Sequence, residues 1–348
     1  MNKLVPTDLA PQASPSPHTV PLSFRRMRLA GAAEPGGVLG GRWVGASSAA
    51  IATPVLAPEL APGGALLDAW QGGHDLQVHQ HGSVRYVTDG HWLHGYAVIE
   101  EGAGGVHAAA KRAYADLFAA LAATPCTHLL RLWNYLAHIN AHADGSERYR
   151  QFNAGRQEAF LEAQRSAFEG SPAACALGTH DGPLHVYFLA SRVPPVAIEN
   201  PRQVSAYRYP DAYGPRAPTF SRAALADVGG GRHALFISGT ASIVGHASLH
   251  LGDVRRQTEE SLANLAAVRD AAAARLGRPF PASEMYYTVY VRQPADLPVV
   301  REVFERAVGP DSLAAREAVY LNSDICRTEL LVEIEAHGFV EHGVRSPA

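Results

Sequence analysis

A carboxylic acid inside an apolar run is the most chemically informative feature of this 348-residue sequence. Glu333 stands within Leu330–Ile334, where burial would disfavour the charged carboxylate and raise its pKa. Such an acid keeps its proton at neutral pH and can protonate a substrate. Cys326, seven residues earlier, is expected on the neighbouring closing strand. In the alternative interpretation, Glu333 and Glu335 both face solvent on an edge strand.

Arginines gather around the segments RLWNYLAHIN and RYRQFNAGR, with Tyr135 beside them. They are Arg131, Arg148, Arg150 and Arg156. Guanidinium groups match carboxylates in a bidentate way, so the cluster predicts a clamp for an anionic substrate. The alternative is surface ion pairing with Glu147 or Glu158, which is common and contributes little.

Two further segments combine polar side chains with a restrained backbone. In YRYPDAYGPR two prolines and a glycine can hold Tyr213 and Arg216 at the mouth of a cleft, unless the segment is a linker with stacked tyrosines. Gly239 and Thr240 end an apolar strand, where glycine permits close approach of a ligand or marks a β-bulge.

Metal and cofactor signatures do not accompany the 17 histidines. The pairs His246/His250 and His138/His142 have i,i+4 spacing, but the first lies in an extended stretch where that spacing separates side chains. His246 remains a candidate to hydrogen-bond a substrate. The sequence has no GxGxxG, P-loop or GxSxG motif, so we expect neither metal nor organic cofactor.

Composition points to a small-molecule partner and a reducing compartment. Thirty Lys and Arg residues balance 33 Asp and Glu residues without like-charge runs, which argues against nucleic acid or an anionic membrane. Three cysteines without a CxxC pair argue against disulfides and structural zinc. The proline-broken start and the proline-containing stretch 46–67 predict neither signal peptide nor membrane span, so we expect a cytoplasmic protein.

Secondary-structure patterns repeat once along the chain, at an offset of roughly 150 residues. The first copy contains a helix at 104–124, a strand at 129–139, a helix at 148–168 and strands at 172–179 and 184–191. The second contains a strand at 233–243, helices at 252–277 and 297–308 around a strand at 285–292, and strands around Ile325 and at 330–334. The order predicts an α+β fold built from two ββαβαββ units.

These patterns divide the chain into five parts. They are a flexible tail at 1–20, a less regular N-terminal part at 21–84, a first lobe at 85–200, a connecting segment at 201–231 and a second lobe at 232–348.

Residues 232–338 resemble the RidA/YjgF family, through FISGTAS, GDVRRQTEESLANL and LLVEIEA. Members of that family are trimers with ligand sites between subunits. The resemblance therefore implies two RidA-like lobes in a pseudo-trimer-like arrangement, with a cleft between them.

The segments RLWNYLAHIN, RYRQFNAGR, YRYPDAYGPRAPTFSRA, FISGTASIVGHASLHLGD and ICRTELLVEIEA together resemble the chorismatase family. This resemblance covers about residues 85 to 340. It implies an enzyme that binds chorismate and releases its enolpyruvyl group as pyruvate without a cofactor.

The resemblance also implies roles for individual residues. Glu333 corresponds to the acid that protonates the enolpyruvyl methylene. Gly239 and Cys326 match the family members that form 3-hydroxybenzoate, with Cys326 able to move a ring proton. The substrate-holding positions it implies are Tyr213, Arg216, Thr240, Arg148, Tyr135 and Arg156.

Other interpretations stay open at this point. The product could include 4-hydroxybenzoate, or the protein could be a chorismate hydrolase that forms a dihydroxycyclohexadiene carboxylate. A RidA-like imine deaminase, with Arg327 on the substrate carboxylate, and a non-catalytic ligand-binding protein are the remaining alternatives. We expect a monomer or a small homo-oligomer; the sequence leaves open the product ratio, the pathway and the role of the first 80 residues.

Overall fold

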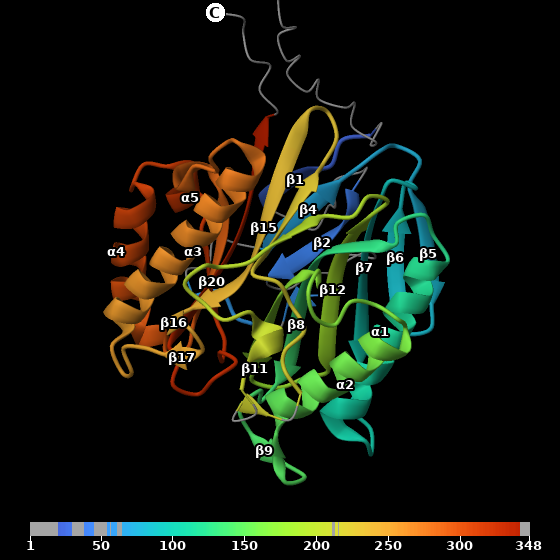
Figure 1. Cartoon of the computed structure of the whole chain (residues 1–348), viewed down its shortest axis with the longest axis horizontal. Coiled ribbons are helices and arrows are strands. Elements are labelled where there is room, and N and C mark those ends of the chain that lie inside the picture. The colour runs from blue at the N-terminus through green and yellow to red at the C-terminus, as the bar shows by residue number, and fades with distance from the viewer. Residues whose placement is uncertain are drawn as a thin grey trace, which may run out of the picture.

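A computed structural model describes residues 20–29, 38–44, 54–55, 57–60, 65–210, 213–214 and 216–341 (Figure 1). Residues 1–19 of the predicted tail lie outside these ranges. No helix within them combines the length and apolar character needed to cross a bilayer.

The N-terminal part forms a four-stranded sheet. It contains β1 (Ser23–Leu29), β2 (Val38–Val44), β3 (Pro54–Val55) and β4 (Ala65–Gln71) in the order β1-β4-β2-β3. Strand β4 pairs antiparallel with both β1 and β2. Phe24 and Trp70 of this sheet are buried, with ring centroids 4.8 Å apart. This part, predicted as less regular, therefore presents a packed face to the rest of the protein.

The first repeat unit is a six-stranded sheet covered by two helices. Its strands are β5 (Gln77–His81), β6 (Val84–Thr88), β7 (Trp92–Ile99), β8 (His128–Ala137), β11 (Ala173–Thr179) and β12 (Leu184–Ser191). Helices α1 (Gly105–Ala122) and α2 (Arg148–Glu162) pack on its outer face. They cross closely at Gly155, where an added Cβ would lie 2.1 Å from the carbonyl oxygen of His107.

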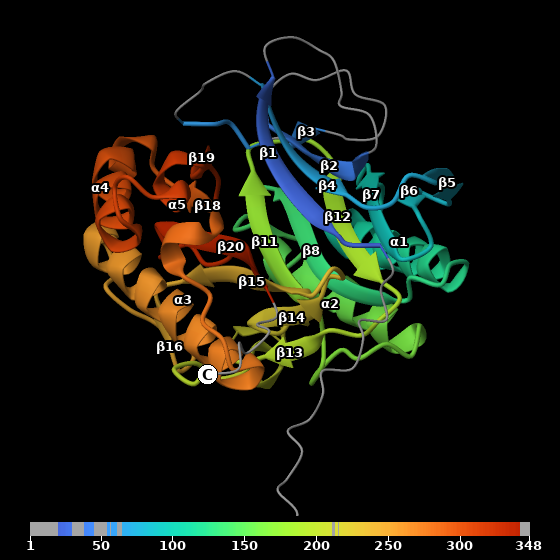
Figure 2. The same ribbon diagram turned by 90° about the horizontal axis from the view of Figure 1, so that it is seen from above.

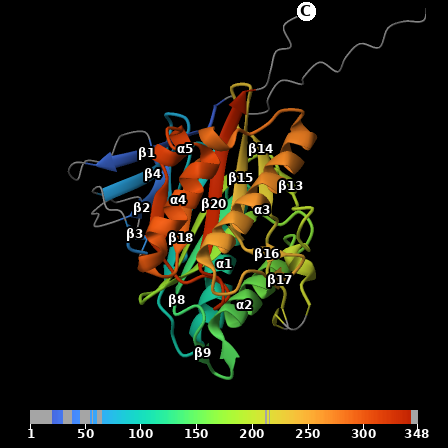
Figure 3. The ribbon, with the colours of Figure 1, turned by 90° about the vertical axis from the view of Figure 1, so that its left-hand side faces the viewer.

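The second repeat unit is built in the same way. Its strands are β13 (Val196–Ile198), β14 (Ala223–Asp227), β15 (Arg232–Ala241), β18 (Tyr286–Val291), β19 (Val319–Asn322) and β20 (Val332–Glu341). Its helices are α3 (Val254–Leu276), α4 (Leu297–Val308) and the short α5 (Leu313–Arg316). Figure 3 shows α3 and α4 in front of β18 and β20, whose outer face they cover.

The two units share one strand order. The first reads β11-β8-β12-β7-β6 with β5 at its edge, and the second reads β19-β18-β20-β15-β14 with β13 at its edge. In each unit one pair is parallel, β8 with β11 and β18 with β19. The predicted α+β fold with two similar units is confirmed. Because β13 and β14 pair within the second sheet, we propose that the second unit extends back to about residue 196, whereas the boundaries at 85, 201 and 232 stay predictions.

The three sheets surround a common interior in the view from above (Figure 2), and one apolar core lies between them. Trp70 of the N-terminal sheet, Trp133 of the first unit and Phe236 of the second all belong to it. The two units also join directly along β11, where Gly178 and Asp324 exchange backbone hydrogen bonds of 2.8 and 3.1 Å. The N-terminal sheet thus takes the third place around a pseudo-threefold arrangement.

The end of the second unit differs from the prediction. The strand expected around Ile325 is β19, which ends at Asn322, and the segment from Ser323 to Leu331 is a loop. In this loop the guanidinium of Arg292 donates hydrogen bonds to the carbonyl oxygens of Ile325, Arg327 and Leu330, at 3.0, 2.9 and 2.7 Å. A side chain therefore takes the bonds that a strand partner would supply, and Cys326 lies on a loop.

Strand β20 is central, which excludes the solvent-facing alternative for its carboxyl groups. It pairs with β15 on one side and β18 on the other. Glu333 and Glu335 are each 4% exposed. Because alternate residues share a face of a strand, both carboxyl groups point to the same interior.

Helix α3 is tied to the strands and the loop by buried amides. Asn264 donates to the carbonyl oxygens of Ala241 and Ile243 at 3.0 and 2.8 Å. Gln257 donates to the carbonyl oxygen of Glu329 and accepts from the amide of Leu331. These bonds fix the end of β15 and the loop that follows β19 against one helix.

We predict that Asn264→Leu lowers the free energy of unfolding by about 2–4 kcal/mol, because a side chain of similar size removes a donor from the carbonyl oxygens of Ala241 and Ile243 and the acceptor of Arg202. Ile243 keeps Gln203 as a donor. Urea denaturation measures the loss. Glu259→Gln, on the exposed face of the same helix, is the control and should stay within about 0.5 kcal/mol of the parent. Equal stability of the two variants would contradict this anchoring role.

Candidate active site

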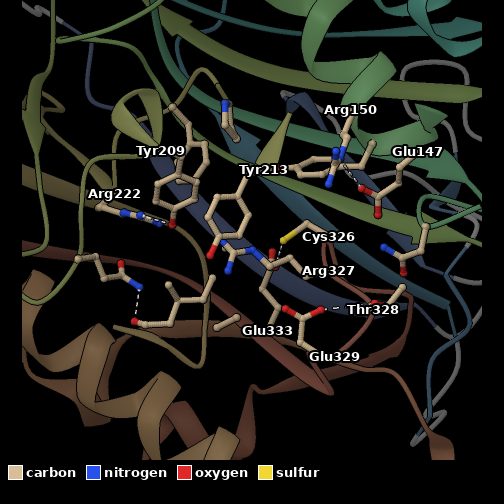
Figure 4. A pocket seen from close by; sticks show the side chains of 18 of the residues that line it. Glu147, Arg150, Tyr209, Tyr213, Arg222, Cys326, Arg327, Thr328, Glu329 and Glu333 are labelled. Atoms are coloured by element: carbon tan, nitrogen blue, oxygen red, sulfur yellow. Dashed lines mark hydrogen bonds and ion pairs between the residues drawn. The ribbon is translucent and has the colours of Figure 1, made fainter. Parts of the chain in front are cut away.

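A cavity of about 420 Å³ opens between the two units (Figure 4). The first unit contributes Asn140, His142, Glu147, Tyr149 and Arg150. The segment between the sheets contributes Gln203, Tyr209, Tyr213, Phe220 and Arg222. The second unit contributes Gly239, Ala241, Cys326, Arg327, Glu329 and Glu333. The cleft thus lies between the two lobes, as expected from the sequence.

Glu333 is the buried acid of this cavity. On β20 it stands between Ala241 of β15 and Tyr290 of β18. Burial, followed by the nearby charge of Glu335, raises its pKa to about 8. Within the described residues its one hydrogen-bond partner is the Cys326 thiol, with Sγ 4.0 Å from Oε2. A carboxyl group in this setting is protonated at neutral pH and can act as a general acid.

Glu335, two residues further on, has the opposite character. Burial opposes its ionisation, but the guanidiniums of Arg42 and Arg131 lower its pKa to about 2. Arg42 Nη1 lies 2.9 Å from Oε1, Arg131 donates to Oε2, and Trp133 Nε1 lies 3.2 Å from Oε1. The arginine predicted to belong to a substrate clamp, Arg131, therefore binds a carboxylate of the protein itself.

Gly239 allows the Glu333 carboxyl group to take its position. It lies at a register shift between Ile237 and Thr240, so it is part of a β-bulge and also lines the cavity. A Cβ built on Gly239 would stand 1.9 Å from Oε1 of Glu333. Any larger residue at this position would push the carboxyl group elsewhere.

Cys326 is a neutral thiol in this environment. Burial, and then the charge of Glu333, raises its pKa to about 12. The thiol can donate a hydrogen bond toward Glu333, whereas thiolate chemistry would need a further change in its surroundings. Its predicted part in moving a ring proton remains a prediction.

Two arginines in the cavity wall have N–H groups without a partner among the described residues. Arg327 donates through Nη1 to the carbonyl oxygen of His246 and to Ser248, and stacks 4.0 Å from the ring centroid of Tyr213, but Nη2 is unbonded. Arg222 donates through Nη2 to the hydroxyl of Tyr209, and its Nε is unbonded. The two guanidiniums place positive charge at the cavity wall, which suits an anionic ligand.

Tyr213 reaches the cavity as predicted in position, and its hydroxyl donates to the carbonyl oxygen of His246 at 2.7 Å. Arg216, three residues on, is exposed and is not among the lining residues. Its role in binding substrate stays a prediction from the resemblance.

Four other predicted binding residues do not line the cavity. Arg148 pairs with Glu101 and donates to the carbonyl oxygen of Ala137 at 2.9 Å. The Tyr135 hydroxyl lies 2.8 Å from that of Tyr290 inside the core.

The other two are also engaged elsewhere. Arg156 is buried over the rings of Tyr114 and Phe160. Thr240 donates to the carbonyl oxygen of Ser238 at 2.8 Å. This geometry does not support assigning these four residues to the substrate, because each side chain is engaged by other groups of the protein.

Several lining residues were not singled out as binding residues, among them Tyr149, Gln203, Tyr209 and Arg222. Arg222 follows the proline-fixed segment directly, which is the one local signal for it. The histidines form no candidate metal centre: within the described ranges no three His, Cys, Asp or Glu side chains gather as ligands. His250 instead lies 3.3 Å from Glu260.

Comparison with known proteins places these features in a family. Residues 68–190 match the model of the FkbO/Hyg5-like chorismatase N-terminal domain. A 3-hydroxybenzoate synthase of Streptomyces hygroscopicus is 42% identical over 239 residues, which is 65% of this chain and 68% of the relative. A chorismatase of Streptomyces rapamycinicus is 38% identical over 278 residues, 77% of this chain and 80% of the relative.

One solved structure supports this placement. A chorismatase crystal structure at 1.08 Å resolution matches with a TM-score of 0.82 and 30% identity, over 92% of this chain and 99% of its own. The chain belongs to the chorismatase family.

We predict that Glu333→Gln stabilises the fold increasingly as the pH rises from 5 to 8. Between the ordinary pKa of a glutamate and the raised value of about 8, the folded chain holds a proton that the unfolded chain has lost, so stability falls by up to about 1.4 kcal/mol per pH unit. Glutamine removes this slope. Urea denaturation at several pH values measures this slope. Glu162→Gln, at an exposed position of α2, is the control. Parallel pH dependences of parent and Glu333→Gln would contradict a protonated Glu333.

Proposed function

We propose that this protein converts chorismate to 3-hydroxybenzoate and pyruvate, with Glu333 as the acid. The observation that carries the proposal is a buried carboxyl group with a pKa of about 8, in contact with the Cys326 thiol and placed in a cavity between the two units. Relatives named 3-hydroxybenzoate synthase and chorismatase support the choice of substrate and product.

The chemistry needs one well-placed proton. Glu333 gives its proton to the methylene carbon of the enolpyruvyl group, which makes an oxocarbenium ion. The neighbouring ring hydroxyl then displaces the activated ether, pyruvate leaves with the ether oxygen, and the hydroxyl proton returns to the carboxylate. The resulting epoxide opens with loss of a ring proton and gains a proton on oxygen. The two products together contain the atoms of chorismate, so this route consumes no water.

The cavity also suits a dianionic substrate. The guanidiniums of Arg222 and Arg327 bring positive charge to its wall, and protonated Glu333 adds no negative charge. The rings of Tyr209 and Tyr213 stand beside these guanidiniums, with centroids 5.4 Å apart. We propose that the two arginines bind the two carboxylates and that the tyrosines contact the ring of the substrate.

The direct test mixes purified protein with chorismate, without added metal, and follows pyruvate by a coupled assay and aromatic acids by chromatography. We expect pyruvate and 3-hydroxybenzoate in equal amounts, and Glu333→Gln should lower turnover by about 10²–10⁴-fold, because glutamine cannot donate a carboxylic proton. Glu162→Gln is the control. A non-aromatic diene acid would show the hydrolytic branch, and full turnover by Glu333→Gln would exclude its role as acid.

A second test asks which guanidinium holds the substrate. Because Arg327 lines the cavity and Arg216 is exposed, Arg327→Met should lower kcat/KM by about 10–100-fold, as expected for a charge-assisted hydrogen bond. Arg216→Met should lower it less. A larger loss for Arg216→Met would support the substrate-binding role that the family resemblance implies for Arg216. It would also require Arg216 to reach the ligand from its exposed position.

A further inference from the structure

Behind the cavity lies a buried network of alternating charges, called the charge network below. Arg26 of β1 donates to both carboxylate oxygens of Asp68 at 2.6 and 2.9 Å. Asp68 accepts from Arg42 at 3.0 Å, and Arg42 donates in turn to Glu335 at 2.9 Å. Arg131 of β8 pairs with the other oxygen of Glu335. The charge network therefore crosses all three sheets, from β1 through β4 and β2 to β20 and β8.

The residues of the charge network are buried too deeply to form a surface ion network. Arg42 is 5% exposed, Asp68 4% and Arg131 2%. An ion pair at such depth does not guarantee stability, because desolvation offsets the attraction, but an uncompensated charge there is costly. Stability alone therefore does not explain the charge network.

The charge network places its guanidiniums unequally between two neighbouring carboxyl groups. Glu333 and Glu335 share one face of β20, and buried carboxyl groups at this spacing resist ionising together. Two guanidiniums contact Glu335, whereas Glu333 has no guanidinium within hydrogen-bonding distance among the described residues. The position of Arg42 and Arg131 thus selects which of the two carries the negative charge.

We infer that Arg42 is a positioning residue of the active site, and that it acts by holding Glu335 as an anion whose charge keeps the proton on Glu333. The inference rests on the proposed function, in which Glu333 is the acid. It gives the N-terminal sheet a part in the reaction, although the lining residues described above include none from β1 to β4.

Other groups that face the carboxyl pair do not change charge near neutral pH. Burial raises the pKa of Tyr135 on β8, Tyr149 on α2, Cys175 on β11 and Tyr290 on β18, and raises that of Cys326 to about 12. Burial lowers the pKa of His337 on β20 to about 3, and Arg222 adds a fixed charge beside the cavity. Because His142, Glu147 and Glu329 also line the cavity, the titration of Glu333 is followed by the NMR signal of its own carboxyl group.

The test uses the full-length protein and Glu335→Gln, which removes the anion and leaves Arg42 and Arg131 without their carboxylate partner on β20. The activity of the parent should fall as the pH rises past the pKa of its acid, and in Glu335→Gln this limb of the kcat/KM profile should move to lower pH by about one unit or more. Carboxyl NMR of the ligand-free protein should show the same shift for the Glu333 signal, which is identified by its loss in Glu333→Gln.

A charge-balanced variant isolates Arg42. In Arg42→Met with Glu335→Gln both ions of the pair are removed, so the Glu333 titration should return part of the way to that of the parent. This variant also keeps the test open if Glu335→Gln does not fold, because replacing both partners is tolerated better than removing one. Arg28→Gln, an exposed member of β1 that pairs with Glu59, is the control and should leave the titration in place.

Two results would overturn the inference. One is a Glu333 titration that does not move in folded Glu335→Gln, and the other is a double variant that titrates like Glu335→Gln. Because the NMR titration needs no chorismate, a failure of the inference is distinguishable from a failure of the proposed function, in which no pyruvate forms whatever the titration shows.

Discussion

Two carboxyl groups buried on one face of β20 impose the constraint on which this structure depends. Ionising both carboxyl groups in the same interior costs free energy. The groups around them therefore determine which one keeps its proton. It does so by bringing guanidiniums from β2 and β8 onto Glu335 and leaving Glu333 with a thiol for a neighbour. The three sheets, the single core between them and the cavity at the junction of the units all serve this distribution of charge.

The two units have the same strand order but contribute different groups to the cavity. Strand β12 is the counterpart of β20, but its sequence LHVYFLAS carries no carboxyl group. The first unit instead supplies one wall of the cavity from the start of α2, where Tyr149 and Arg150 lie. The buried carboxyl groups belong to the second unit, and the cavity lies where the two units meet.

Much of the fold was predictable, because helical spacing and apolar runs are local properties. The ranges expected for α1, α4 and β8 agree closely with the structure. The burial of Glu333 was also predictable, since its apolar neighbours in the sequence are its neighbours on the strand. Arg42 was not, because nothing near it in sequence indicates that it meets a glutamate 293 residues away. Tyr135 and Arg148 were misleading for the same reason: strand facing and distant partners decide where they point.

The loop that carries Cys326 has a consequence for how this family can diversify. Arg292 holds the loop through main-chain oxygens, and these are the same for every amino acid. The path of the backbone is thereby independent of which side chain stands at position 326. Evolution can exchange that side chain, and with it the chemistry of the cavity wall, while the scaffold beneath it stays as it was.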